Sequence, residues 1–377
     1  MNLNILALTC SQIAQYLQDN HGKGKFHARA LIREIIKTGN LKFHLAREFQ
    51  DSPRLTESLV QDLFFPPMEI IEQQEASGTL KFVTQLKDGL TIESVVIPMK
   101  RYSTLCVSTQ AGCRMGCIFC ETAKQGFQRN LAVHEITGQL FLARFTLKKK
   151  IKNIVFMGMG EPFDNPESLF QAIRVFNDPR GFDVALRHMT VSTCGLIPGI
   201  QSLARQGMPQ INLAVSINSA DDGIRSMLMP VNQRYSLTKL KDALLAYPLL
   251  SRRVIFIEYI LIKNINDSRK DAEKLVTYLS GLTVRVNLIA YNPTVPDHET
   301  KQVSGKDGTP LSLQSVDDEA LHEFATILET AGLFVVKRWA KGRSLQAGCG
   351  QLSGKQRVKP MRIVSIYQKS ERSTQIV

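Results

Sequence analysis

Residues 104–120 read Thr-Leu-Cys-Val-Ser-Thr-Gln-Ala-Gly-Cys-Arg-Met-Gly-Cys-Ile-Phe-Cys. The stretch begins as a short apolar, β-branched run, which is typical of a buried strand, and leads into a cluster of cysteines. Similar strand-like runs lie near 104–108, 153–157, 189–192, 211–216, 254–262 and 284–290. Segments with helical periodicity lie near 133–145, 166–176, 197–206, 236–246, 268–279 and 315–331. This alternation predicts a parallel α/β sheet, either open or curved into a partial barrel.

In either arrangement, functional groups belong at the carboxyl ends of the strands. Polar, glycine-rich segments follow these strands: the cysteine cluster, 158–162, 192–195, 216–218 and Asn292 with Pro293. We therefore expect the site on this rim of the sheet.

The three clustered cysteines, Cys113, Cys117 and Cys120, have the spacing Cys-x3-Cys-x2-Cys. The chain has 7 cysteines, an odd number, so a framework of structural disulfides is not expected. Zinc sites usually combine Cys-x2-Cys with a second, distant pair, which this sequence lacks. Three thiolates in one loop suit an iron–sulfur cluster that keeps one iron open. A zinc knuckle and unligated thiols remain the alternatives.

The charge balance indicates a polyanionic partner. The 377 residues include 47 Lys and Arg against 34 Asp and Glu, a net charge of +13. No apolar run approaches the roughly 18 residues that a membrane helix needs, and the first apolar stretch, 5–8, is too short for a signal peptide. We expect a cytoplasmic protein without a membrane partner.

Residues 1–75 have mainly helical patterns, clearest from His27 to Thr38, where Gly39 ends the helix. A basic stripe beside the apolar face of this helix is either a solvated surface or a nucleic-acid docking surface. It comprises Lys25, Arg29, Arg33 and Lys37. Asp88-Gly89 then separates two strand-like runs, which predicts a β-hairpin.

Several segments match a known family in order along the chain. They are Leu-Cys-Val-Ser-Thr-Gln-Ala-Gly-Cys at 105–113, Lys-Gln-Gly-Phe at 124–127, Val-Phe-Met-Gly-Met-Gly-Glu-Pro at 155–162, Met-Pro-Val-Asn at 229–232 and Cys-Gly-Gln-Leu at 349–352. Together they closely resemble the RlmN/Cfr family of radical S-adenosylmethionine (SAM) RNA adenine methyltransferases. The resemblance covers nearly the whole chain. It implies a partial (β/α)6 barrel of the radical SAM type with a small helical N-terminal domain.

The resemblance also implies the cofactors. One [4Fe-4S] cluster would be held by Cys113, Cys117 and Cys120, and SAM would chelate its open iron. Two SAM molecules would be used per turnover, one as methyl donor and one as radical source, with electrons from an external donor. The residues implied to bind SAM are Gly160, Glu161, Ser192, Ser216, Ile217, Asn218 and Asn292.

Three further residues would carry the chemistry of the family. Cys349 would accept a methyl group from SAM. The deoxyadenosyl radical would remove a hydrogen atom from that methyl group, and the resulting carbon radical would add to adenine. Glu93 would remove the ring proton from the resulting protein–RNA adduct. Cys106 would attack the bridging sulfur, which leaves a disulfide between Cys106 and Cys349.

The implied organisation has four parts: an RNA-docking domain at 1–75, a hairpin linker at 76–98, a radical SAM core at 99–345 and a C-terminal segment at 346–377. This last segment contains the catalytic cysteine and a basic tail. The substrate would be ribosomal RNA, transfer RNA or both, methylated at carbon-2 or carbon-8 of adenine. A radical SAM enzyme with another substrate, or a non-catalytic iron–sulfur RNA-binding protein, is the alternative.

Overall fold

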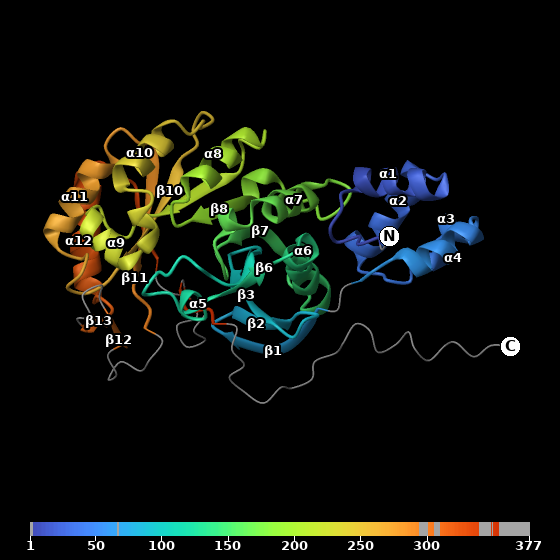
Figure 1. The fold of residues 1–377 in the computed structure, drawn as a ribbon, viewed down its shortest axis with the longest axis horizontal. Coiled ribbons are helices and arrows are strands. Elements are labelled where there is room, and N and C mark those ends of the chain that lie inside the picture. The colour runs from blue at the N-terminus through green and yellow to red at the C-terminus, as the bar shows by residue number, and fades with distance from the viewer. Residues whose placement is uncertain are drawn as a thin grey trace.

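A computed structural model describes residues 3–65, 68–293, 301–304, 310–338, 348 and 350–353. Its central feature is a 10-stranded sheet with the order β1-β2-β3-β4-β7-β8-β9-β10-β11-β14 (Figure 1). The strands are β1 (Glu69–Ala76), β2 (Thr79–Gln85), β3 (Thr91–Pro98), β4 (Ser103–Cys106), β7 (Ile151–Phe156), β8 (Met189–Thr193), β9 (Asn212–Ser216), β10 (Ile255–Leu261), β11 (Val284–Ala290) and β14 (Val335–Arg338). Two small two-stranded sheets pair β5 (Gln110–Gly112) with β6 (Phe127–Asn130), and β12 (Lys301–Ser304) with β13 (Pro310–Leu313).

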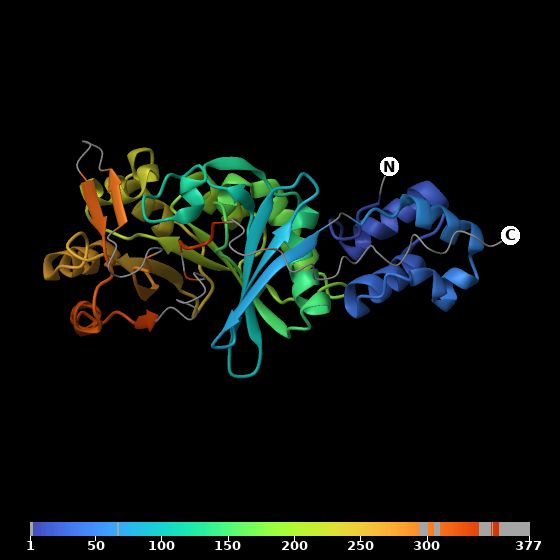
Figure 2. The same ribbon diagram turned by 90° about the horizontal axis from the view of Figure 1, so that it is seen from below.

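Within the main sheet, each strand from β4 through β7, β8, β9, β10 and β11 to β14 pairs in parallel with the next, and helices alternate with these strands along the chain (Figure 2). All six predicted strands are present, and the α/β fold is confirmed. β14 is a further parallel strand that the sequence patterns did not reveal. The helices of this part are α5 (Glu121–Lys124), α6 (Val133–Phe141), α7 (Pro166–Asn177), α8 (Ile197–Arg205), α9 (Asp222–Leu228), α10 (Leu237–Leu245), α11 (Arg269–Leu279) and α12 (Asp318–Thr330).

The predicted hairpin consists of β2 and β3, and it belongs to the main sheet. β3 pairs antiparallel with β2 and with β4, so the hairpin extends the barrel sheet sideways. The helical pattern expected up to residue 75 ends earlier, because 69–76 form β1 and pair with β2. This pairing satisfies the backbone groups of the segment, and local sequence periodicity does not report it.

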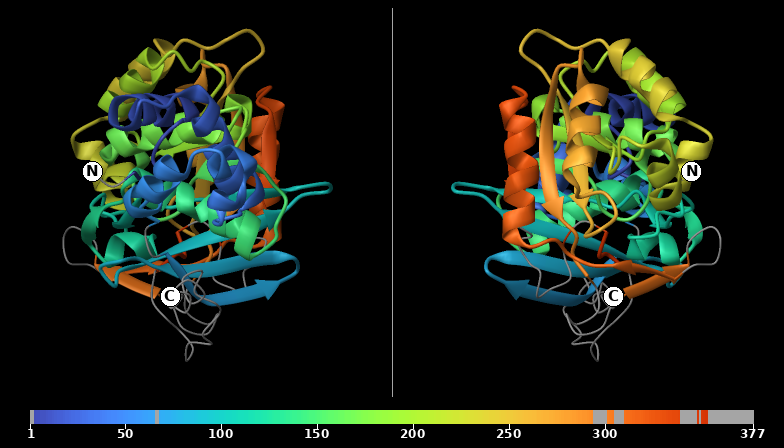
Figure 3. Two further views of the ribbon diagram at one scale, coloured as in Figure 1. Left: turned by 90° about the vertical axis from the view of Figure 1, so that its right-hand side faces the viewer. Right: turned by 90° about the vertical axis from the view of Figure 1, so that its left-hand side faces the viewer.

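The N-terminal helices form a lobe at one end of the molecule (Figures 1 and 3). The predicted 27–38 helix is α2 (Lys25–Ile32), which continues as a π-helical turn over Arg33–Lys37. The lobe contacts the barrel through Lys37, which donates to the Pro179 carbonyl at 3.0 Å, and through Leu6, whose carbonyl accepts from Thr137 of α6 at 2.6 Å. The other helices of the lobe are α1 (Cys10–His21), α3 (Arg47–Gln50) and α4 (Pro53–Asp62).

Within the described residues, no helix is both long and apolar enough to cross a membrane.

Replacing Thr137 by Val tests how the lobe is attached. The change preserves shape but leaves the buried Leu6 carbonyl without this donor, so the free energy of unfolding should fall by about 1–3 kcal/mol. Urea denaturation followed by circular dichroism measures the loss. Thr277→Val is the matched control, because Thr277 is exposed and bonds only within its own helix, to the Glu273 carbonyl. Equal losses in the two variants would contradict the attachment.

Candidate active site

The cysteine loop and the carboxyl ends of the parallel strands enclose one cavity of about 150 Å³. All three clustered cysteines line it, as do the predicted SAM-binding residues Gly160, Glu161, Ser192, Ser216 and Asn218. These residues come from segments as much as 105 positions apart, from Cys113 to Asn218. The expectation that they share one rim of the sheet therefore holds for the structure.

The backbone of the cysteine loop is fixed by a close approach at Gly112. This residue has φ +74°, and a Cβ atom here would lie 1.8 Å from the carbonyl oxygen of Gly126. That same oxygen accepts a hydrogen bond from the Cys113 amide at 3.2 Å. Only glycine fits between the two backbone segments, and the contact sets where the first cysteine of the loop lies.

Arg114 holds the next part of the loop. Its Nε atom lies 2.8 Å from Asp164, and its guanidinium centre lies 3.7 Å from the centroid of the Phe127 ring. The loop is thus anchored by an ion pair and a cation–π contact as well as by its backbone.

The three thiols lie in surroundings that favour their protonated form. Burial raises the pKa of Cys113 to about 12, and it raises the pKa of Cys117 and Cys120 above the ordinary thiol value. Iron binding at these sulfurs would have to displace protons, which makes it dependent on pH. The described residues contain no group of three or more His, Cys, Asp or Glu side chains arranged to hold a single metal ion. A multi-iron cluster places its thiolates on separate metal atoms, so three well-spaced cysteines suit it.

Glu161 organises the wall opposite the cysteines. Its carboxylate accepts hydrogen bonds from the Phe163 amide at 3.1 Å and the Cys194 amide at 2.8 Å, while burial raises its pKa. Gly160, with φ +96°, packs so closely on Gln110 that a Cβ would lie 2.5 Å from the Gln110 side chain. Glu161 therefore joins the loop after β7 to the loop after β8, and Gly160 packs the same loop against β5.

The predicted SAM-binding residues after β9 differ from one another. Ser216 and Asn218 line the cavity, but Ile217 is fully buried in the main hydrophobic core. Asn218, with φ +55°, uses its carboxamide to accept from the Ile260 amide at 2.9 Å. Asn292 lies in a different cavity, described below.

Two polar groups of the site were not predicted from the sequence. Arg225 is fully buried, and it donates to the carbonyls of Cys194 at 2.8 Å, Ser216 at 3.1 Å and Ile217 at 3.1 Å. Glu258 lines the cavity, and burial raises its pKa although Asn287 donates to it at 2.7 Å. No local pattern marks either residue, since Arg225 binds the loops after two strands at once and Glu258 pairs with Asn287 of β11.

A second, larger cavity of about 730 Å³ adjoins Cys106, which is 7% exposed. Asn292, Gly348 and Leu352 also line it, and polar side chains such as Asn153 and Thr190 lie along its walls. Its volume is in the range of small-molecule sites.

Glu93 is almost completely buried, although sequence alternation alone would allow it to face solvent. It is 1% exposed, one carboxylate oxygen lies 3.7 Å from Lys81, and the other accepts from the Ser353 amide at 3.2 Å. Its backbone is also held, because its amide donates to the sulfur of Met159 at 3.3 Å and its carbonyl accepts from Ser108 at 2.7 Å. Glu93 therefore has a fixed position beside the strand that carries Cys106.

Cys349 lies outside the described residues, but several of its neighbours are placed. Gly350 lines the cluster cavity, and its carbonyl accepts from the Glu121 amide at 2.7 Å. The Leu352 carbonyl accepts from Thr122 at 2.7 Å. The segment 350–353 thus joins the cysteine loop to Glu93.

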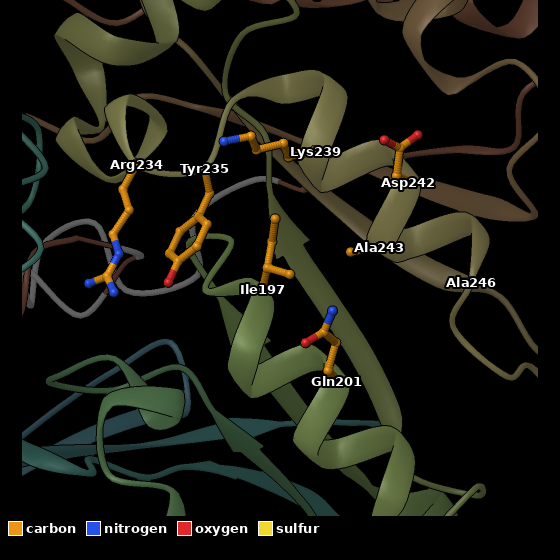
Figure 4. A pocket seen from close by; sticks show the side chains of 8 residues that line it. All are labelled: Ile197, Gln201, Arg234, Tyr235, Lys239, Asp242, Ala243 and Ala246. Carbon is orange, nitrogen blue, oxygen red and sulfur yellow. The ribbon is translucent and has the colours of Figure 1, made fainter.

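A third pocket, of about 440 Å³, lies between α8 and α10 on the outer helical layer (Figure 4). Arg234 and Tyr235 lie at one end of it, and Lys239 and Asp242 project from α10. It contains none of the predicted site residues.

Comparison with known proteins agrees with this geometry. The Radical SAM superfamily profile matches residues 107–276. The chain is 38% identical over 350 residues to the probable dual-specificity RNA methyltransferase RlmN 1 of Protochlamydia amoebophila, which covers 93% of this chain and 94% of that protein. It is 39% identical over 355 residues to the dual-specificity RNA methyltransferase RlmN of Syntrophus aciditrophicus, with 94% and 97% covered. The chain belongs to the RlmN family of radical SAM RNA methyltransferases.

Among solved structures, a radical SAM methyltransferase from Sphaerobacter thermophilus has a fold similar to that of this RlmN-family chain. Its TM-score is 0.82 at 31% identity, and the match covers 94% of this chain and 100% of that one. The predicted resemblance and the partial-barrel fold are confirmed.

Membership of the radical SAM superfamily implies a [4Fe-4S] cluster and SAM, and the residues present fit both. Three thiols and a strand-end wall of backbone and polar side chains line the same cavity. Iron–sulfur clusters use thiolates as ligands. The strand ends offer hydrogen-bonding groups for the amino and carboxylate groups of SAM.

Gly112→Ala should prevent proper assembly of the cluster site. The new methyl group would displace the Gly126 carbonyl and with it the Cys113 amide, so iron and sulfide content after anaerobic reconstitution should fall by more than half. Gly126→Ala is a matched control: Gly126 has a similar φ of +70°, but a Cβ added there would have no atom within 4 Å. Each variant has a left-handed backbone cost of about 1–2 kcal/mol. If both lose the cluster equally, the close approach at Gly112 is not the cause.

Proposed function

We propose that this protein methylates an adenine ring carbon, carbon-2 or carbon-8, in ribosomal RNA, transfer RNA or both, through a methylated Cys349. One observation carries the proposal. Gly348 lines the cavity beside Cys106, Gly350 lines the cavity beside the cluster cysteines, and Ser353 bonds to Glu93. The residue between the two glycines is Cys349. The relatives of this protein are named dual-specificity RNA methyltransferases, which supports an RNA substrate.

When bound, a single [4Fe-4S] cluster with two SAM molecules per turnover would supply a methyl group and a 5′-deoxyadenosyl radical, using an electron from an external donor, and would take one electron back from the radical adduct on the adenine ring. The adduct then holds only paired electrons when Glu93 and Cys106 act on it. Cys113, Cys117 and Cys120 would hold the cluster. Gly160, Glu161, Ser192, Ser216 and Asn218 would hold SAM, with Ile217 supporting them from the core and Asn292 contacting the nucleotide from the neighbouring cavity.

Cys349 would carry the methyl group because an aromatic adenine carbon is too weak a nucleophile to take it from SAM directly. In the adduct, Glu93 would accept the proton of the attacked ring carbon. The Cys106 thiolate would then attack the sulfur of Cys349. The sulfur–sulfur bond forms as the carbon–sulfur bond breaks, its electron pair stays with the methylene carbon, and that carbon takes up a proton to become a methyl group. The resulting disulfide must be reduced before each new turnover.

RNA binding would use charge at both ends of the chain. We propose that 1–75 dock RNA and that the basic segment 346–377, which begins beside the active site, contributes further phosphate contacts. A target adenine would leave its stack to reach the cavity beside Cys106. The remaining parts would be the hairpin at 76–98 and the radical SAM core at 99–345, in a cytoplasmic enzyme.

The direct test supplies the anaerobically reconstituted protein with reductant, isotope-labelled SAM and total RNA that lacks the modification. Methyladenosine should appear in the nucleoside digest, and its chromatographic identity by mass spectrometry assigns carbon-2 or carbon-8. Heat-denatured protein is the control. Deoxyadenosine without any methylated nucleoside from ribosomal or transfer RNA would contradict the proposed substrate.

Two cysteine variants test the covalent route. Cys106→Ala should accumulate a protein–RNA adduct, seen as a shifted band sensitive to ribonuclease, because the adduct has lost the thiol that resolves it. Cys349→Ala should lose methylation by more than about a thousandfold, as expected for loss of the nucleophile, while it keeps its cluster absorbance. Cys10→Ala, in the N-terminal lobe, should behave as wild type. Free methylated product from Cys106→Ala would overturn the resolving role.

A further inference from the structure

The β2 strand buries a lysine where an apolar residue would be expected. Lys81 is 3% exposed, and its neighbours Leu80, Phe82 and Val83 are buried as well. It is the only buried lysine among the described residues. A buried ammonium group costs several kcal/mol of desolvation, by rough estimate, unless it has a partner. A buried ion pair seldom stabilises a fold more than an apolar pair would. The burial of Lys81 is therefore not explained by stability and indicates another role.

The partner of Lys81 is Glu93. The Lys81 Nζ atom lies 3.7 Å from one carboxylate oxygen, and both side chains are nearly inaccessible, at 4% and 1%. Lys81 is paired with Val95 across the two strands, and Glu93 is paired with Val83. The two charged residues are therefore diagonal neighbours on the same face of the sheet.

This face of the sheet also carries Cys106. Val95 is paired with Lys81 on one side and with Cys106 of β4 on the other. Glu93 is two residues from Val95 on the same strand, so it lies diagonal to both the lysine and the thiol. Val95 and Cys106 line the larger cavity, which places the row beside the proposed nucleotide site.

Several described elements bring polar or ionisable groups to Glu93. β2 contributes Lys81, β4 contributes Cys106, and β3 itself has no other charged residue. The loop after β7 contributes the sulfur of Met159, and the C-terminal segment contributes the Ser353 amide.

We propose that Lys81 is a positioning residue, which holds the Glu93 carboxylate ionised and oriented to take the ring proton of the RNA adduct. The inference rests on the proposed function, in which Glu93 is the base. Burial alone favours a neutral carboxyl group, and a neutral carboxyl cannot accept the proton. The nearby ammonium charge opposes that effect. In the step itself, one proton passes from the ring carbon to a Glu93 oxygen, and the carbon–hydrogen bonding pair stays with the ring.

Lys81→Met tests the role in single-turnover reactions between about pH 6 and 9. Without the cation, Glu93 should hold its proton to higher pH, so the acid limb of product release moves upward. At neutral pH, release should slow by on the order of tenfold and the covalent adduct should accumulate, while deoxyadenosine formation continues. Lys81→Arg should restore release. Lys87→Met, at an exposed position on the same hairpin, should leave product release, adduct accumulation and deoxyadenosine formation unchanged at every pH.

A double-mutant cycle tests whether Lys81 acts through Glu93. Adding Lys81→Met to Glu93→Gln should have no further effect on adduct release, and the double variant also removes the buried ion pair as a whole, which guards against misfolding of the single variant. An unshifted acid limb in Lys81→Met, or an equal slowing by Lys81→Met in both backgrounds, would overturn the inference. Failure of the proposed function gives a different result: Cys106→Ala and Glu93→Gln would then accumulate no adduct.

Discussion

The site depends on how the carboxyl ends of the parallel strands satisfy their backbone carbonyl groups. A strand that ends in a buried loop leaves carbonyls without ladder partners, and each unpaired group costs about 1–3 kcal/mol. Arg225 binds the carbonyls that follow β8 and β9 with one fully buried guanidinium group. Asn266 does the same between β9 and β10, where it donates to the carbonyls of Asn218 and Ile260. These side chains fix the wall of the cluster cavity before any cofactor binds.

The Met-Pro-Val-Asn segment at 229–232 acquires a physical explanation from this arrangement. Asn232 accepts from Arg225 at 2.7 Å and donates to Asp222 at 2.7 Å, so it holds the guanidinium group in place. Pro230 lies beside Gly116 of the cysteine loop. The motif therefore contacts the loop that carries the cysteines and orients the arginine that closes the strand ends, and its first residue, Met229, lines the cluster cavity.

Sequence patterns predicted the parts of the fold that depend on local periodicity and spacing. The six strands, the helices between them and the cysteine loop were found because each has a repeat or a spacing with one physical interpretation. The strand β14 was missed because only its pairing with β11, a strand more than 40 residues earlier, identifies it. The strand β1 pairs with its neighbour β2, but its Glu residues are poor strand formers, so its composition did not indicate a strand. Lys81 and Arg225 were missed for a different reason: charged residues are usually exposed, and their burial depends on partners 12 or more positions away, or on several loops at once.

The basic stripe on α2 illustrates how tertiary structure changes the meaning of a charge pattern. Arg33, in the π-helical turn that continues α2, pairs with Glu48 of α3 at 2.8 Å, and Lys37 contacts the barrel at Pro179. All four residues of the stripe are exposed. Half of the stripe therefore holds the lobe together and on the barrel while it also contributes to the positive surface.

The segment 350–353 has to satisfy two opposite demands if the residue before it reacts in both cavities. It must stay close to the cysteine loop and to Glu93, and it must release the product-bearing cysteine in every cycle. The carbonyls of Gly350 and Leu352 accept hydrogen bonds from α5, the helix that follows the cysteine loop, and the Ser353 amide donates to Glu93. Gln351 donates to the carbonyls of Asn292 and Pro293, and the Leu352 side chain packs in the main hydrophobic core. Each hydrogen bond contributes about 0.5–1.5 kcal/mol and the buried leucine about 1.5–3 kcal/mol, so the segment can separate from the barrel only at a cost of several kcal/mol. Because the Ser353 amide bonds to Glu93, such a movement also changes the surroundings of the proposed base. Lys81, on a strand of the main sheet, then keeps that carboxylate oriented whichever position the segment takes.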